Sequence, residues 1–176
     1  MFSRQVNESS RLCLTVPQFT DDLFALTQRN REYLQAWLPW VDKVKTPQDT
    51  RDFIIEQLSK FVLSEALHAC IFYDGLLAGA LAYNCIDLQN RSGQIGYWLG
   101  QDFQGKGIMT ECVKDLIRVG QDYYQLERFE IRCAAKNARS RAIPERLGFE
   151  MEGTIRRAEK VHDHWYDHIV YGKLVA

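Results

Sequence analysis

A glycine-containing stretch from Ile95 to Glu111 combines the features that bind phosphate. It includes Gly105 and Gly107, and it lies between a strand pattern and the start of an amphipathic helical pattern. Free backbone N–H groups and the positive end of a helix dipole meet at such a junction, which suits an anion. Glycine also allows positive φ and close approach of the backbone to a ligand. The stretch therefore favours a phosphate or pyrophosphate group.

The stretch does not match two common nucleotide motifs. Gly100, Gly105 and Lys106 have the spacing of a Walker A loop, but Gly107 stands where a Ser or Thr would bind Mg²⁺. The segment from Gly105 also lacks the third glycine of a dinucleotide fingerprint, and no strand–helix repeat surrounds it. Both nucleotide interpretations fail.

The elements that must position this loop follow from apolar periodicity. Period-2 patterns predict strands at 12–16, 68–73, 77–86, 92–100, 128–135, 149–157 and 165–174, with a hairpin turn near 161–164. Helical spacing predicts helices at 21–38, 47–62, 110–124 and 138–147, the last interrupted by Pro144. This order predicts an α+β fold, a mixed sheet with helices on its faces. The length of 176 residues fits a single domain over 1–176.

Composition excludes several classes of protein. The net charge of −1 does not indicate binding to nucleic acid or an anionic membrane. No apolar run approaches the roughly 20 residues of a membrane span, and the first 20 residues show no targeting segment. The five cysteines have irregular spacing without a CxxC pair, so we expect a reducing, cytoplasmic location and no metal. His162, His164 and His168 lack supporting carboxylate or thiol spacing for a metal site.

A second stretch, Asn137-x-x-Ser140-x-x-Ile143-x-x-Arg146-Leu-Gly-Phe149, follows the loop. Together, the Gln104-Gly-Lys-Gly-Ile-Met loop and this stretch resemble the GCN5-related N-acetyltransferases (GNAT), in the branch that acetylates the N-termini of ribosomal proteins. The resemblance covers nearly the whole chain, including an aromatic segment at 30–40 and the terminal hairpin. It implies a mostly antiparallel mixed sheet of about seven strands, splayed between the fourth and fifth, with helices on both faces. It also implies acetyl-CoA as co-substrate.

The resemblance assigns cofactor binding to residues of the loop, the strand before it and the following helix. Loop amides would hold the pyrophosphate, and the pantetheine arm would lie between the splayed strands. The assigned residues are Tyr97, Trp98, Leu99, Gln104, Gly105, Lys106, Gly107, Ile108, Met109, Asn137, Ser140 and Arg146. Asp102 departs from the usual Gln or Arg, which we expect to be harmless because main-chain amides bind the phosphates. Residues 128–146 carry a net charge of +4, which suits phosphate or is simply a solvated face.

Two residues have implied catalytic roles. Ser140 would protonate the departing thiolate, or it lies in the first turn of a helix capped by Asn137. Pro144 removes a helical bond to the Ser140 carbonyl, so we expect a short or kinked helix. Glu159 would be the base for the amine, or it forms a surface ion pair with neighbouring basic residues. A modest base suffices, because an α-amino group has a pKa near 7.7–8.0.

These residues predict acetyl transfer to the N-terminal amine of a protein, by direct attack in a ternary complex. The acceptor that the resemblance implies is a ribosomal protein with N-terminal Ser or Ala, and the implied assembly is a homodimer. Cys133 lies near the expected thioester, but no base partner supports a covalent acetyl-cysteine route. The alternatives are acetylation of a small amine (a polyamine or an aminoglycoside) and a non-catalytic acyl-CoA-binding module. Tyr33, Trp37 and Trp40 favour a peptide over a small polyamine.

Overall fold

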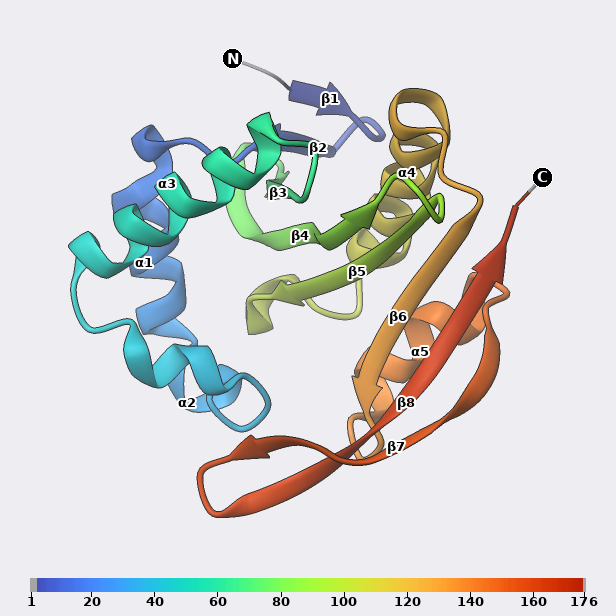
Figure 1. The fold of residues 1–176 in the computed structure, drawn as a ribbon. Helices are drawn as coiled ribbons and strands as arrows, with labels where there is room; N and C mark the ends of the chain where they lie inside the picture. Colours follow the sequence, from blue (N-terminus) through green and yellow to red (C-terminus); the bar gives the residue numbers. More distant parts are fainter. Residues whose placement is uncertain (1–2, 176) are drawn as a thin grey trace.

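The computed structural model describes residues 3–175, which form one sheet of eight strands with helices on both faces (Figure 1). The strand order is β1-β2-β3-β4-β5-β6-β8-β7, and every neighbouring pair is antiparallel except β5 and β6. The strands are β1 Ser3–Gln5, β2 Ser10–Leu14, β3 Leu67–Tyr73, β4 Leu76–Asp87, β5 Ser92–Leu99, β6 Arg128–Ala134, β7 Glu150–Val161 and β8 His164–Leu174. The mixed, mostly antiparallel sheet predicted from the sequence is confirmed.

The two parallel strands at the centre of the sheet separate along their length. The β5–β6 pairing covers only Ser92–Ile95 opposite Arg128–Ile131. Beyond it β5 continues to Leu99, while β6 continues to Ala134 in partnership with β8. Figure 1 shows the two strands diverging toward the side that carries the loop before α4. The predicted splay is therefore present, and it leaves strand edges without sheet partners at this place.

Helices cover the sheet because their apolar stripes require burial. In Figure 1, α1 and α3 lie on one side and α4 on the other. On α4, Cys112, Val113 and Leu116 are buried in the main core, as its periodicity predicts. Leu26 of α1 and Ile54 of α3 form a second buried cluster. The helices are α1 Thr20–Arg29, α2 Arg31–Leu34, α3 Pro47–Val62, α4 Ile108–Tyr124 and α5 Ala138–Arg146. No helix within 3–175 is both long and apolar enough to cross a membrane.

Two elements differ from the prediction. The sheet gains the short strand β1, whose Arg4 donates to the buried carboxylate of Asp115 on α4 at 2.6 Å. The single helix predicted for 21–38 is wrong, because it breaks at Asn30 into α1 and α2. The Asn30 amide donates to the Leu26 carbonyl at 2.9 Å and accepts from the Gln101 backbone N–H at 2.9 Å. These bonds fix the end of α1 to the segment after β5, which no local pattern reveals.

Pro144 does not interrupt α5, so the predicted break is also wrong, whereas the expected short helix is present with nine residues. The helix continues to Arg146, and the Leu147 N–H donates to the Ile143 carbonyl at 3.1 Å. The missing Pro144 N–H leaves the Ser140 carbonyl without its helical partner. That carbonyl instead accepts a hydrogen bond from the Tyr97 hydroxyl at 2.9 Å. A tertiary contact thus replaces the bond that proline removes.

The predicted terminal hairpin is confirmed, with a turn at residues 162–163 between β7 and β8. Its tip reaches toward the α2 region, as Figure 1 shows. His162 Nδ1 lies 3.3 Å from Asp42 Oδ2, and the rings of Trp37 and Tyr166 lie 5.6 Å apart. The hairpin therefore closes one end of the space that the splayed strands leave open.

Candidate active site

A cleft of about 2130 Å³ occupies the splay between β5 and β6. It extends from the loop before α4, past Ser140, to Trp37 and Glu159. All twelve residues predicted to bind the cofactor line it, as does the predicted base Glu159. Elements far apart in the sequence thus bring every predicted site residue to one continuous space.

The loop predicted to bind phosphate presents open backbone at the start of α4. Gly105 and Gly107 both have φ of +74°, and a Cβ on either would meet no protein atom within 4 Å. Ile108 and Met109 bury their side chains in the core, which anchors the helix while its first N–H groups keep no intrahelical acceptor. This geometry fits a phosphate group, which backbone amides can bind where no side chain intervenes. Lys106 lies over the Phe103 ring, 5.8 Å from Nζ to the ring centre.

Polar side chains connect the two walls of the cleft beside this loop. Arg139 of α5 donates to Gln104 Oε1 at 2.6 Å, and Gln104 Nε2 donates to the Tyr33 hydroxyl at 2.5 Å. Arg146 donates to Thr110 Oγ1 at 2.8 Å. Two guanidinium groups therefore lie next to the open amides, so the positive charge of this stretch is partly directed into the cleft.

Other basic residues of segment 128–146 pair with carboxylates. Arg128 bonds to Glu152 at 2.6 Å, and Arg141 lies 3.4 Å from Glu145. The net charge of +4 already includes Glu145, so of these two carboxylates only Glu152, which lies outside the segment, offsets part of it. The sequence alone could not separate the two interpretations, because partners such as Glu152 come from another strand.

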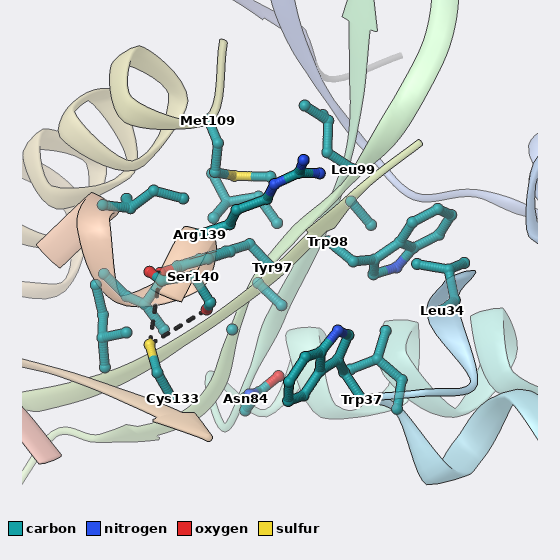
Figure 2. Close-up of a pocket in the computed structure, with 18 of the residues that line it drawn as sticks. Leu34, Trp37, Asn84, Tyr97, Trp98, Leu99, Met109, Cys133, Arg139 and Ser140 are labelled. Carbon is teal, nitrogen blue, oxygen red and sulfur yellow. Dashed lines mark hydrogen bonds between the residues drawn. The ribbon is translucent and has the colours of Figure 1, made fainter. Parts of the chain in front are cut away.

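The hydroxyl of Ser140 lies at the middle of the cleft, in the first turn of α5 (Figure 2). It donates to Cys133 Sγ at 3.2 Å. The Ser140 N–H donates to Asn137 Oδ1 at 3.2 Å, so Asn137 is the N-cap that the sequence predicts. The Asn137 cap holds Ser140 in the first turn of α5, and from this position the Ser140 hydroxyl still faces the cleft. The structural and the catalytic interpretation of Ser140 are therefore compatible.

Cys133 shares this place but has the chemistry of a buried thiol. It lies on β6, and burial raises the pKa of its thiol above the ordinary value. Since the nucleophilic form is the thiolate, this environment disfavours a covalent acetyl-cysteine route at neutral pH. Its sulfur accepts the Ser140 hydroxyl hydrogen bond and so helps to orient that side chain.

Glu159 reaches the cleft from β7 through an irregular strand. The pairing register with β8 shifts between Ile155 and Glu159, and Arg157 within this bulge has φ of +48°. A bulge bends a strand and redirects its side chains. Glu159 Oε2 lies 3.3 Å from His168 Nε2 of β8, and within 3–175 it forms no ion pair with the flanking basic residues. The surface ion pair considered for Glu159 is therefore wrong. Sequence reasoning missed His168 as a partner, because only the bulge brings the two together.

The end of the cleft beyond Ser140 has an aromatic wall. Trp40 and Trp98 lie 6.0 Å apart between ring centres, and Trp37 packs against the hairpin. Trp98 faces this wall whereas Tyr97 faces Cys133, since adjacent strand residues point to opposite faces. Sequence reasoning missed Asn84, which lies at a register shift of β4 and is labelled beside Trp37 in Figure 2.

Comparisons with known proteins agree with this arrangement. The family model described as "Acetyltransferase (GNAT) domain" matches residues 11–150. The chain is 33% identical to YdaF of Bacillus subtilis (strain 168) over 99% of this chain and 96% of that protein. It is 30% identical to the ribosomal-protein-serine acetyltransferase of Escherichia coli (strain K12), over 97% of this chain and 96% of that protein.

Solved structures show the same fold. The chain superposes with a TM-score of 0.94 on the ribosomal L7/L12 alpha-N-protein acetyltransferase RimL in complex with coenzyme A, at 28% identity and 97% coverage of both chains. In that complex a disulfide joins coenzyme A to a cysteine. It also superposes with a TM-score of 0.93 on the microcin C7 self-immunity acetyltransferase MccE in complex with acetyl-CoA and AMP. Identity there is 32%, covering 97% of this chain and 94% of MccE.

Proposed function

Starting from the chain's membership of the GNAT family of acetyltransferases, which makes it an acetyl-CoA-dependent N-acetyltransferase, we propose that its acceptor is the N-terminal α-amino group of a ribosomal protein beginning with Ser or Ala. One observation carries the proposal. A single cleft joins open loop amides, the Ser140 hydroxyl and the Glu159 carboxylate. The cleft continues along an aromatic wall, which can contact the residues of a peptide that follow its N-terminal amine. The Escherichia coli relative at 30% identity is named for ribosomal-protein acetylation, and so is the RimL structure at 28% identity.

The loop before α4 fits the phosphate groups of acetyl-CoA as the acetyl donor. Gly105 and Gly107 leave a space that a Cβ would fill, next to Arg139 and Arg146. When bound, acetyl-CoA supplies an acetyl thioester. With its phosphates on the loop, the splay between β5 and β6 leads toward Ser140, so this chain would orient the reactive end there.

Proton transfers are assigned to two residues. Glu159 accepts the proton that the acceptor amine must lose, and His168 holds its carboxylate at 3.3 Å. The amine needs little help, because its pKa lies near 7.7–8.0. Ser140 donates its hydroxyl proton to the departing sulfur and regains one from solvent. Cys133 keeps the Ser140 hydroxyl oriented until then.

We also propose a domain organisation, a location and an assembly for the protein. Residues 1–176 act as one N-acetyltransferase domain, in the cytoplasm where ribosomal proteins are made, and two copies associate. The outer edge of β7 supports association, since within residues 3–175 it has no strand partner and β7 carries the exposed Met151. Unpaired apolar strand edges are surfaces that a second chain can cover.

A panel of acceptors tests the substrate class. We expect purified protein with acetyl-CoA to acetylate peptides that copy ribosomal-protein N-termini beginning with Ser or Ala, with tandem mass spectrometry placing the acetyl group on the α-amine. A peptide blocked at its N-terminus but carrying an internal Lys is the matched control. Preferential acetylation of spermidine or an aminoglycoside would favour the small-amine alternative. Binding of acetyl-CoA without turnover of any acceptor would favour the non-catalytic module.

A further inference from the structure

Both backbone polar groups of Ser140 are held by side chains from outside its own helical ladder. Its N–H donates to the cap Asn137 at 3.2 Å. Its carbonyl would accept from residue 144 in an ordinary helix, but Pro144 has no N–H to donate. The Tyr97 hydroxyl donates to that carbonyl at 2.9 Å. The peptide units on either side of Ser140 are thus fixed from two directions.

Tyr97 makes this contact across the splay. The β5–β6 pairing ends at Ile95, so Tyr97 lies on the part of β5 that has lost its neighbour β6. Its hydroxyl bridges from there to α5, and it lies 3.9 Å from Cys133 Sγ, the atom that accepts the Ser140 hydroxyl hydrogen bond. One phenol therefore touches the backbone of Ser140 and the partner of its side chain.

We propose that Tyr97 is a positioning residue, which sets the direction of the Ser140 hydroxyl through the carbonyl that Pro144 leaves free. This inference rests on the proposed role of Ser140 as proton donor. The Tyr97 proton is already used in the bond to the carbonyl, so the phenol is not itself the acid. Burial raises the pKa of Tyr97 well above its ordinary value, which keeps the hydroxyl a donor throughout the assay range. Pro144 and Tyr97 act as a pair, because Pro144 leaves the Ser140 carbonyl without a helical donor and the Tyr97 hydroxyl supplies the replacement.

The test is a double-mutant cycle on this pair. Tyr97→Phe removes only the hydroxyl, and we expect kcat to fall about tenfold, equivalent to about 1.4 kcal/mol, with little change in the KM for acetyl-CoA. Pro144→Ala restores an N–H that can bond the Ser140 carbonyl, and we expect near-normal activity. In the Pro144→Ala background, Tyr97→Phe should cost less than about threefold, because the helix then holds the carbonyl. An equal loss in both backgrounds would overturn the proposal.

A second cycle needs no change at Pro144. If Tyr97 acts through Ser140, adding Tyr97→Phe to Ser140→Ala should lower kcat no further. The residual kcat of Ser140→Ala is compared with that of the double variant. A further tenfold loss there would mean that Tyr97 acts on the reactants directly, which also overturns the proposal. The unfolding midpoint of each variant serves as the folding control, and the acetyl-CoA Kd separates a loss of binding from a loss of the chemical step.

The two cycles separate failure of this inference from failure of the proposed function. Full activity in Ser140→Ala would remove the acid role and the positioning role together. A large loss in Ser140→Ala with no loss in Tyr97→Phe would leave the acid role intact and remove only the positioning role.

Discussion

Three glycines with the same backbone geometry allow the phosphate-binding role of the loop to be separated from its effect on folding. Gly105 and Gly107 have φ of +74° and line the cleft. Gly75 has φ of +80° in the turn between β3 and β4, and it does not line the cleft. A Cβ on any of the three would meet no protein atom within 4 Å. Alanine therefore perturbs the free protein at each position through backbone strain alone.

All three glycine variants should lose a similar amount of stability, but only the two in the loop should lose affinity for acetyl-CoA. Left-handed backbone costs an L-residue about 1–2 kcal/mol. For a chain of this size each 1 kcal/mol lowers the Tm by roughly 2–4 °C, so all three variants should melt roughly 2–8 °C lower. In the loop, the added methyl also occupies the space that a phosphate must enter. Loss of one hydrogen bond to a charged group costs about 1.5–3 kcal/mol, which is about a 10- to 150-fold rise in Kd.

Isothermal titration with acetyl-CoA, together with thermal unfolding, measures both quantities. We expect Gly105→Ala and Gly107→Ala to bind acetyl-CoA about 10- to 150-fold more weakly, and Gly75→Ala to bind it as the wild type does. Gly105→Ala and Gly107→Ala with wild-type Kd and the shared fall in Tm would refute the assignment of the loop. A rise in Kd for Gly75→Ala as well would show that strain anywhere weakens binding, and the geometric argument would fail.

Four further outcomes follow from the site and its surroundings. Ser140→Ala should lower kcat about 10²- to 10⁴-fold with the acetyl-CoA Kd unchanged, and full activity would leave solvent as the acid. Glu159→Gln should impair the rate most at low pH and progressively less above the α-amino pKa, whereas a defect independent of pH would indicate a binding role. Burial lowers the pKa of His68 to about 4 in the folded chain, against 6.5 for the ordinary side chain. Only the unfolded chain then takes up a proton between these values, so stability should fall by up to about 3 kcal/mol as pH drops from 6.5 to 4. Urea unfolding should show a smaller fall in His68→Gln, and an unchanged pH dependence would contradict this origin. Light scattering should give the mass of two chains, and a monomer at all concentrations would exclude the dimer.

Local patterns were sufficient for features whose cause is local. The strand, glycine loop and helix from Ile95 onward depend on periodicity and on backbone freedom within a few residues, and the structure has them where they were predicted. The cap at Asn137 depends on a side chain reaching three residues ahead. The break at Asn30 was not predictable in this way, because its amide is fixed by the backbone of Gln101, 71 residues later.

The amino-acid sequence by itself determined the glycine loop before α4, the capped turn that carries Ser140 and the residue types available for proton transfer. Only the tertiary structure decided which of them meet. The splay after Ile95 opens the cleft, the bulge before Glu159 brings it to His168, and Tyr97 takes the carbonyl that Pro144 cannot satisfy. Each of these depends on strand pairing over long sequence separations. A register shift reverses the face to which a side chain points, and no short-range pattern encodes that choice.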